Sequence, residues 1–333
     1  MGRQMRKYLV EEKGLLSPEF NPNEVYVRST DVNRTIDSAL SQVQGLFHYP
    51  HALSPHQQDI LPPFKLSHDV LNLAQNLGSA PLPNNIAAVP VHIPNHHFDE
   101  FNPMSMCKAL SAAHHHHGHG DYVYKTLTDR YWDHIQEYGD HFNFKPDQYT
   151  ARHELDSSDT VWSHWFDRRE TPGLSDEFLK TMMDMRRDYF HHNNCAEPWM
   201  AKVYTTHTLA TILNEFYESV NWNKNGMADD ANRRKFYFWS DHDTGVQNFS
   251  CVFNYKFPIY IPFDAHILFE LYYDSDYYVT MKIDDKPFVL GGACGDKIEC
   301  PLNDFKQHVQ EISYVGDMEK WKHHCKHGSK EYA

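Results

Sequence analysis

The chain has 333 residues, and with 41% hydrophobic and 14% aromatic residues it can bury a substantial core, which argues against wholesale disorder. Its formal net charge of -14 argues against nucleic acid as a partner, because a phosphate backbone requires clustered Lys and Arg. No apolar run approaches the roughly 18 residues of a membrane span, and no apolar core of a secretory signal precedes residue 25, so as written the chain starts inside the cytosol.

The first 47 residues predict a helix, a strand, a polar turn and a second helix. Apolar residues at near-helical spacing indicate a helix within 1–16, and Glu24 to Val27 predicts a short strand. The polar segment 28–35 reads Arg-Ser-Thr-Asp-Val-Asn-Arg-Thr, and apolar residues at helical spacing follow it as far as Phe47. Such a strand, loop and helix direct loop amides and side chains toward an anion.

The middle of the chain divides into two segments of different character. Residues 48–97 are rich in Pro, His and Asn and predict a long surface connection, with a short helix near 69–76 and a strand near 87–92. Residues 98–195 instead carry Trp, Tyr, Phe and Met at helical spacing. We interpret this second block as a helical insertion whose apolar stripes are core packing without a role in chemistry.

The last third returns to alternating helices and strands. A long helix is predicted from Met200 to Tyr217, and an aromatic strand over 235–239 runs directly into Ser-Asp-His-Asp-Thr at 240–244. A helix continues to Val252, and residues 267–283 predict a β-hairpin. This alternation indicates an α/β sandwich with a helical cap.

The predicted domain organisation follows from this change of character. Residues 1–97 form the first part of an α/β core, residues 98–195 a mainly helical cap insertion, and residues 196–333 the second part of the core.

Three side chains at the two strand-to-loop junctions suit phosphate-ester chemistry. Arg34 is a rigid, permanently charged fork that fits phosphate oxygens. His242 can donate hydrogen bonds to the same oxygens when it is protonated, and Asp243 beside it is a candidate proton donor to a leaving alkoxide at low pH. Each residue alone fits an ordinary surface or turn role, so the hypothesis depends on the constellation.

Six cysteines fit no C-x-x-C spacing for zinc or redox chemistry. Cys294 and Cys300 bracket a charged turn, which favours a small disulfide loop over free thiols. A disulfide requires an oxidising compartment, in conflict with the missing signal sequence.

A run of histidines provides a hypothesis of another class. Residues 114–119 read His-His-His-His-Gly-His, and several imidazoles on a flexible loop can chelate a divalent metal. The competing interpretation, a solvated loop that binds metal only adventitiously, is the favoured one, so we predict no metal site.

Taken in order, these segments resemble the histidine acid phosphatases, the cap-bearing branch of the histidine phosphatase superfamily. The resemblance rests on 27–35, on Val-Pro-Val-His at 89–92, on 240–244, on Phe-Glu-Leu-Tyr at 269–272 and on Cys294 through Cys-Pro-Leu at 300–302. It covers nearly the whole chain, and the ordered series is more specific than any one motif.

The resemblance implies a three-layer α/β sandwich with an inserted helical cap and hydrolysis of phosphate monoesters through a phosphohistidine, with no cofactor. It places a phosphate-binding arginine at Arg34, the second active-site histidine at His242 and the proton donor at Asp243. The implied ligand is a small phosphorylated substrate or inorganic phosphate, and the implied location is secreted or lysosomal.

The resemblance also implies disulfide pairs. It pairs Cys107 with Cys325 and Cys294 with Cys300, and Cys195 with Cys251 is what remains.

The sequence departs from the family in one respect that concerns catalysis. The family's nucleophilic histidine lies in an Arg-His-Gly-x-Arg segment on the opening strand, and these 333 residues contain no such segment. Arg152-His153-Glu154 is no replacement, because it lies in the cap block, lacks the glycine and second arginine, and precedes no strand. We therefore expect the chain to lack the first core strand and to show no measurable acid phosphatase activity.

Two explanations of this departure remain. The chain is either a copy truncated at its N-terminus or a pseudoenzyme that retains a phosphate site for binding. Because the resemblance starts abruptly at residue 1, within a predicted helix, truncation is the favoured interpretation.

Overall fold

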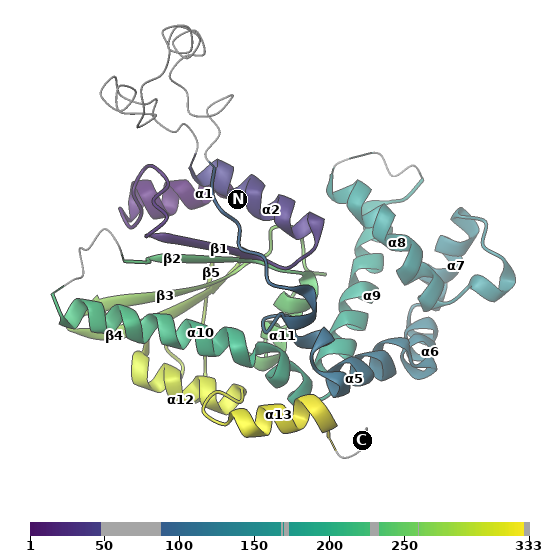
Figure 1. Ribbon diagram of the computed structural model, residues 1–333. Helices are drawn as coiled ribbons and strands as arrows, with labels where there is room; N and C mark the ends of the chain where they lie inside the picture. The colour runs from purple at the N-terminus through teal and green to yellow at the C-terminus, as the bar shows by residue number, and fades with distance from the viewer. Residues whose placement is uncertain (48–87, 168, 170–172, 227–232, 259, 330–333) are drawn as a thin grey trace, which may run out of the picture. The chain divides into compact units, whose positions relative to one another are not determined.

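The computed structural model describes residues 1–47, 88–167, 169, 173–226, 233–258 and 260–329 (Figure 1). The chain divides into two compact units, the first formed by 1–95 with 223–241 and the second by 96–222 with 242–333. The division into a two-part core and a cap stays a prediction.

The first unit contains a parallel pair of strands covered by helices. Its elements are α1 (Gly2–Arg6), the π-helix η1 (Lys7–Glu12), β1 (Val25–Ser29), α2 (Asn33–Leu46) and β2 (Phe236–Ser240). In the β1–β2 ladder Ser29 lies opposite Ser240, so both strands end at the same edge of the pair. Helix α2 contacts both strands and buries its apolar stripe in the core of this unit.

The predicted strand, loop and helix of residues 24–47 are therefore confirmed. The predicted first helix is shorter than 1–16, because the helical turns end at Glu12 and Gly14 adopts a φ of 57°. The strand expected near 87–92 is reduced, within the described residues, to a single bridge between Arg28 and His92. The helix expected over 69–76 lies outside the described residues.

Helices make up most of the second unit. They are α5 (Lys108–His119), α6 (Asp121–Arg130), α7 (Trp132–His141), α8 (Ala151–Phe166), α9 (Asp176–Cys195), α10 (Pro198–Lys224), α11 (Asp243–Val252), α12 (Leu302–Ile312) and α13 (Met318–His327), with short 3₁₀ turns η3 (His96–Phe98), η4 (Pro103–Ser105), η5 (Pro146–Gln148) and η6 (Gly292–Cys294).

Local capping explains where several of these helices begin. Thr150 accepts a hydrogen bond from the His153 amide at the start of α8, and Ser175 accepts one from the Phe178 amide at the start of α9. The Met and aromatic stripes of the predicted insertion form buried clusters, as expected. The helical character predicted for residues 98–195 is thus confirmed.

The strands of the second unit form an antiparallel sheet. Its strands are β3 (Ile267–Asp274), β4 (Asp276–Ile283), β5 (Lys286–Phe288) and β6 (Cys300–Pro301). Asp274 pairs with Asp276 at the hairpin turn, and Ser275 between them adopts a φ of 60°, a conformation typical of tight turns. The predicted hairpin is confirmed, and helix α12 contacts β4.

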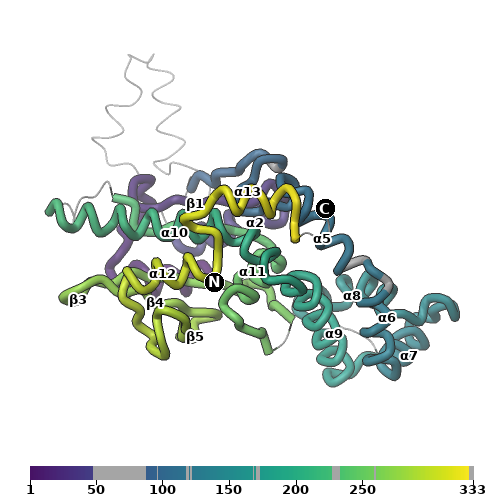
Figure 2. The backbone as a smooth tube through the Cα atoms, turned by 90° about the horizontal axis from the view of Figure 1, so that it is seen from below, coloured from purple at the N-terminus to yellow at the C-terminus, as the bar shows by residue number. Residues whose placement is uncertain are grey.

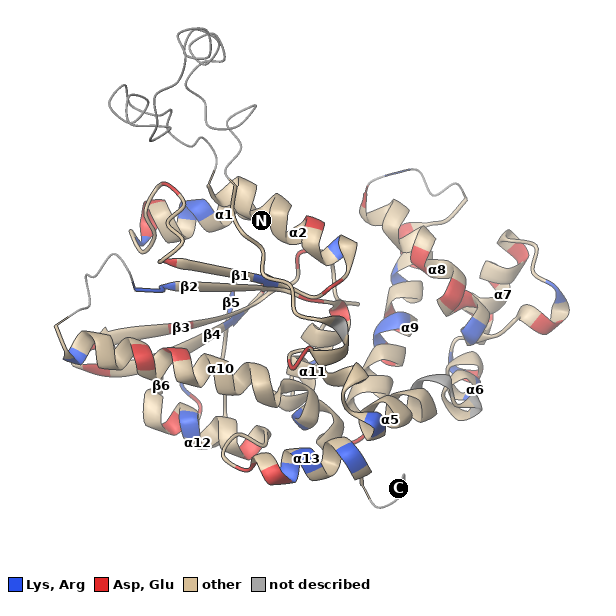
Figure 3. Ribbon diagram, viewed as in Figure 1, with Lys and Arg blue, Asp and Glu red and all other residues tan. Residues whose placement is uncertain are grey.

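All six cysteines form disulfide bridges, which are the two pairs implied by the resemblance and the pair that remained. They are Cys107–Cys325, Cys195–Cys251 and Cys294–Cys300. The first bridge ties the segment before α5 to α13, which runs beside α5 (Figure 2). Acidic and basic residues are interleaved along α9, whereas the charged residues of α8 are mainly acidic (Figure 3). Within the part of the chain that the structure describes, no helix is both long and apolar enough to cross a membrane.

Candidate functional site

Arg34 lies exposed on the first turn of α2, at the end of a loop that buried hydroxyl groups hold in place. Thr30 and Thr35 share a hydrogen bond of 2.8 Å between their hydroxyl oxygens. Ser240 at the end of β2 donates to the Thr35 carbonyl over 2.8 Å. These three side chains are at most 9% exposed, so their polar atoms must be paired within the protein. The chain thus holds the backbone next to Arg34 in one position.

His242 and Asp243 lie at the junction between β2 and α11. β2 ends at Ser240, and His242 is the residue that caps the N-terminus of α11, with its carbonyl accepting from the Gly245 amide over 3.0 Å. Asp243 is the first residue of the helix, where the positive end of the helix dipole favours a negative charge. Arg34 belongs to the first compact unit, and His242 and Asp243 belong to the second.

Two hydrogen bonds fix the carboxyl group of Asp243. The Thr244 amide donates to Oδ1 over 2.8 Å, and the phenol of Tyr260 donates to Oδ2. Tyr260 is 3% exposed, and burial followed by the nearby charge of Asp243 raises the pKa of its hydroxyl well above the ordinary value. Tyr260 therefore remains protonated and acts as a hydrogen-bond donor to Asp243.

A buried arginine supports Tyr260 from α9. The Arg186 guanidinium lies 5.1 Å from the centre of the Tyr260 ring, at a distance typical of a cation–π contact. Its Nη1 donates to the Leu155 carbonyl and to Ser158 Oγ, each over 3.1 Å, and its Nη2 donates to Asp159 Oδ1 over 3.0 Å. Asp243, Tyr260 and Arg186 thus form a chain of contacts that reaches from α11 to α8.

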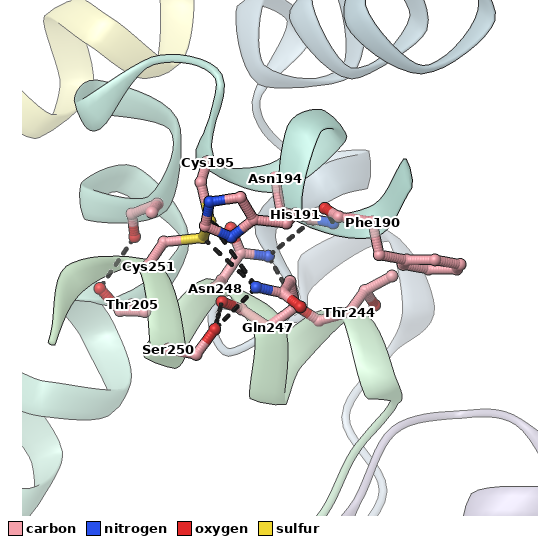
Figure 4. Close-up of a disulfide and its surroundings, with 11 residues drawn as sticks. Phe190, His191, Asn194, Cys195, Thr205, Thr244, Gln247, Asn248, Ser250 and Cys251 are labelled. Carbon is pink, nitrogen blue, oxygen red and sulfur yellow. Dashed lines mark hydrogen bonds between the residues drawn. A yellow bond between two sulfur atoms is a disulfide. The ribbon is translucent and has the colours of Figure 1, made fainter. Parts of the chain in front are cut away.

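A disulfide and an amide pair join α11 to α9 (Figure 4). Cys195 at the end of α9 is bonded to Cys251 in α11. The fully buried Asn248 donates from Nδ2 to Asn194 Oδ1 over 3.2 Å and to the Thr244 carbonyl over 2.8 Å. These contacts anchor the second half of α11 to α9, and the Asn248 bond to the Thr244 carbonyl extends to the first turn, where Asp243 lies.

Sequence reasoning missed Tyr260 and Arg186. Tyr260 lies in an apolar segment between Pro258 and Pro262, which indicates a fixed turn but no contact with Asp243. Arg186 lies among the methionines and aromatics of α9, where the sequence shows only a helical stripe.

The histidine run is placed differently from the prediction. The flexible loop expected at 114–119 is wrong, because these residues form the last turns of α5. His117 Nε2 lies 3.1 Å from Glu197 Oε1, and burial lowers the pKa of His114 to about 4. Among the described residues no group of three or more His, Cys, Asp or Glu could hold a metal ion.

The Arg152-His153 pair lies on the first turn of α8. His153 Nε2 is 3.1 Å from Gln148 Nε2, and the Arg152 guanidinium lies 4.4 Å from the centre of the Tyr124 ring. Both side chains therefore have structural partners within the second unit.

Residues 1–284 match the profile of the histidine phosphatase superfamily (branch 2). The chain belongs to this superfamily.

Among curated proteins, the chain resembles three kinds of phosphatase over a short segment. It is 45% identical over 47 residues to the human (Homo sapiens) lysophosphatidic acid phosphatase type 6, which is 14% of this chain and 11% of that protein. It is 47% identical over 47 residues to the Caenorhabditis elegans putative acid phosphatase 10, with 14% and 11% covered, and to the Mus musculus testicular acid phosphatase, with 14% and 10% covered. The aligned segment thus spans about a tenth of the length of these relatives.

Solved structures of phytases share the fold. The Citrobacter braakii phytase superposes with a TM-score of 0.63 at 14% identity, covering 94% of this chain and 85% of that chain. The apo form of the Hafnia alvei phytase gives a TM-score of 0.61 at 15% identity, covering 94% and 84%. The predicted α/β fold with a helical cap is confirmed.

Proposed function

We propose that this protein is an acid phosphatase-like member of its superfamily that binds phosphate monoesters, with Arg34 and His242 as phosphate ligands and Asp243 as the proton donor. One observation carries the proposal. In this chain of the superfamily, the parallel strands β1 and β2 end at the same edge of the pair. Arg34 lies on the first turn of α2, which follows β1, and His242 and Asp243 lie at the start of α11, which follows β2. Helix N-termini and such strand ends are the usual positions of anion ligands in α/β folds.

The three residues supply different parts of the chemistry. The Arg34 guanidinium can bind two phosphate oxygens at once, and protonated His242 can donate to a third. Asp243 in its protonated form gives a proton to the leaving alkoxide.

Turnover requires a nucleophile as well, and the sequence carries no Arg-His-Gly-x-Arg segment. We therefore propose that these 333 residues bind a phosphate monoester without hydrolysing it at a measurable rate, because loss of a nucleophile lowers turnover by orders of magnitude. The alternative to an acid phosphatase-like protein is a pseudoenzyme that binds a phosphorylated ligand. It too is expected to bind a phosphate monoester without hydrolysing it.

The test combines an activity assay and a binding measurement on the purified chain. Hydrolysis of an aryl phosphate at pH 5 should be undetectable, while titration calorimetry should detect binding of inorganic phosphate. The variants Arg34→Ala and His242→Ala should each weaken that binding. Robust hydrolysis refutes the proposed inactivity, and absence of phosphate binding refutes the proposed site.

The location that fits best is secreted or lysosomal. All six cysteines are paired, and disulfides persist in oxidising compartments. The relatives include acid phosphatases and a lysophosphatidic acid phosphatase, which supports a small phosphorylated ligand.

A further inference from the structure

The Cys195–Cys251 bridge differs from the other two disulfides in its exposure. Cys195 is the last residue of α9, Cys251 lies in the last turn of α11, and both are partly exposed. The four cysteines of the other bridges are buried, each at most 9% exposed. Because thiol–disulfide exchange requires access to a sulfur, a thiol in solution reaches the Cys195–Cys251 bridge more readily than the other two.

Polar side chains contact the sulfurs of this bridge. His191, one turn before Cys195 on α9, has its Nδ1 3.3 Å from Cys195 Sγ. Gln247 Nε2 lies 3.7 Å from Cys195 Sγ and 3.9 Å from Cys251 Sγ, and both side chains point toward the bridge (Figure 4). In the part of the chain that the structure describes, no histidine nitrogen makes such a bond to a sulfur of the other two bridges. Hydrogen-bond donors stabilise a thiolate, which is the form that a sulfur takes when its bridge opens.

The two sulfurs of the bridge are not equivalent as leaving groups. Both cysteines lie in the last turn of a helix, where the helix dipole disfavours a thiolate on either of them. The His191 imidazole, however, bonds to Cys195, and Gln247 Nε2 is also closer to that sulfur than to the other. Cys195 is thus the better leaving group, and Cys251 is the sulfur that an incoming thiolate attacks.

Positive charge around His191 favours the same outcome. Burial lowers the pKa of His191, and the charges of Lys256 and Arg187 lower it further. The charge of Asp188 opposes this lowering. The imidazole is therefore neutral at pH 7 and can donate through Nδ1 to a thiolate. The two cations that disfavour a proton on His191 also favour a negative charge on the sulfur beside it.

We infer that Cys195–Cys251 is a redox-responsive bridge, which a dithiol opens in the folded protein and thereby releases α11 from α9. One thiolate of the dithiol attacks Cys251 Sγ, the bond between the two cysteine sulfurs breaks, and its electron pair leaves on Cys195 Sγ. The second thiolate of the dithiol then attacks the dithiol sulfur bound to Cys251, which closes a disulfide in the dithiol and frees Cys251. Two electrons pass to the bridge, and the two protons of the dithiol end on Cys195 and Cys251.

Opening the bridge loosens α11 without removing its other contacts. The hydrogen bond from Asn248 to Asn194, of 3.2 Å, remains, but the covalent tie between the last turns of α11 and α9 is lost. Local opening of α11 therefore becomes more frequent. The same helix carries Asp243 on its first turn, so the redox state of the bridge acts on the helix of the proposed proton donor. The opening of the bridge does not itself depend on the proposed function.

Graded reduction of the full wild-type chain under native conditions tests the inference. The protein is incubated with increasing concentrations of dithiothreitol, alkylated with iodoacetamide and mapped by mass spectrometry. Cys195 and Cys251 should be labelled at dithiothreitol concentrations about tenfold lower than any other cysteine. If another pair is labelled first, or if all six cysteines react together, the inference is overturned.

Two further measurements test the direction of attack. Brief exposure to reduced glutathione, followed by acid quenching, should leave the mixed disulfide on Cys251. His191→Phe should raise the dithiothreitol concentration needed for opening about fivefold, because the Cys195 thiolate loses a donor. His192→Phe is the matched control, since His192 is the next residue of α9 and is also partly exposed, and it should leave this concentration unchanged. A mixed disulfide mainly on Cys195, or equal effects of the two variants, contradicts the proposed route.

Hydrogen exchange measures the release of α11. After selective opening of the Cys195–Cys251 bridge, the amides of α11 should exchange at least about tenfold faster, because a disulfide that closes a loop restricts local unfolding. The amides of α12 serve as the internal control and should keep their rates. Unchanged exchange in α11 refutes the release, even where the bridge is the first to be reduced.

Discussion

The loop of Arg34 and the carboxyl group of Asp243 are held by different kinds of contact. The Arg34 loop depends on short hydrogen bonds of Thr30 and Ser240, at the strand ends of one parallel pair, to Thr35 on the first turn of α2. Asp243 depends on Tyr260, a side chain 17 residues away, and through it on Arg186. The proposed phosphate ligand Arg34 is thus positioned through its backbone. The proposed proton donor Asp243 is instead positioned through a hydrogen bond to its carboxyl group.

The largest effect is expected when the positive charge of Arg34 is removed. Arg34→Ala should lower the affinity for inorganic phosphate about 100-fold, because charge-assisted bonds to an anion are lost. Unfolding free energy should change by less than about 0.5 kcal/mol, since Arg34 is exposed. Calorimetry and urea unfolding measure the two quantities. Arg3→Ala, at an exposed arginine of α1, is the control, and an affinity loss below about threefold in Arg34→Ala contradicts the assigned role.

The next largest effect is expected on acidification, which should destabilise the second unit more than the first. Among the residues that the structure describes, the pKa is lowered for six histidines, and all of them lie in the second unit: His114, His191, His192, His207, His308 and His324. Burial lowers the pKa of His114 from 6.5 to about 4, against a hydrogen bond to Asn193 that raises it, and the charge of His117 adds to the lowering. The unfolded chain therefore takes up the proton first, and stability present above pH 6.5 is lost as the pH falls toward 4.

For His114 alone this loss amounts to about 2 kcal/mol at pH 5. Hydrogen exchange at pH 7 and pH 5 should show α5 and α9 losing protection before α2 does. His114→Gln should reduce the difference in urea midpoint between the two pH values. Earlier loss of protection in α2 is the result that contradicts the prediction.

Tyr260→Phe tests the support of the proton donor. The ring and its contact with Trp162 remain, but Asp243 Oδ2 loses its donor, so the unfolding free energy should fall by about 1.5 kcal/mol. Urea unfolding measures the change. Tyr149→Phe removes a similar phenol bond, of 2.8 Å to the exposed Asp140, and should cost less than about 0.5 kcal/mol. Equal effects in both variants indicate that Tyr260 has no special part in holding Asp243.

The parts of this site differ in how well the sequence predicts them. The strand, loop and helix around Arg34 are contiguous, so apolar spacing indicates each element and its order. Tyr260 and Arg186 come to Asp243 by tertiary packing across separate helices, which leaves no periodic signal. The resemblance to the family suggests roles for the residues at the strand ends, but it does not indicate which side chains support them.

At the histidine run, residues 114–119, the sequence-based prediction was wrong rather than incomplete. Residues 114–119 were predicted as a loop because histidine-rich tracts are compositionally biased, yet α5 continues through them. Leu110 and Ala113, both fully buried, fix the preceding turns against α13, and Cys107 is bonded to Cys325 there. Tertiary packing of one face therefore decides the conformation, as it does for most helices of moderate propensity.

Thr35→Val gives the smallest expected effect and completes the comparison. Valine has nearly the same shape, so the change removes only the hydroxyl that bonds to Thr30 and to the Val32 carbonyl, the latter over 2.8 Å. The unfolding free energy should fall by about 1 kcal/mol, and phosphate affinity by a few fold, because the backbone next to Arg34 gains freedom. Thr126→Val removes an exposed hydroxyl bond of 2.8 Å to the Tyr122 carbonyl and should leave both quantities unchanged. A stability loss in Thr35→Val without a loss of phosphate affinity shows that the hydroxyl bonds stabilise the strand pair but do not position the arginine.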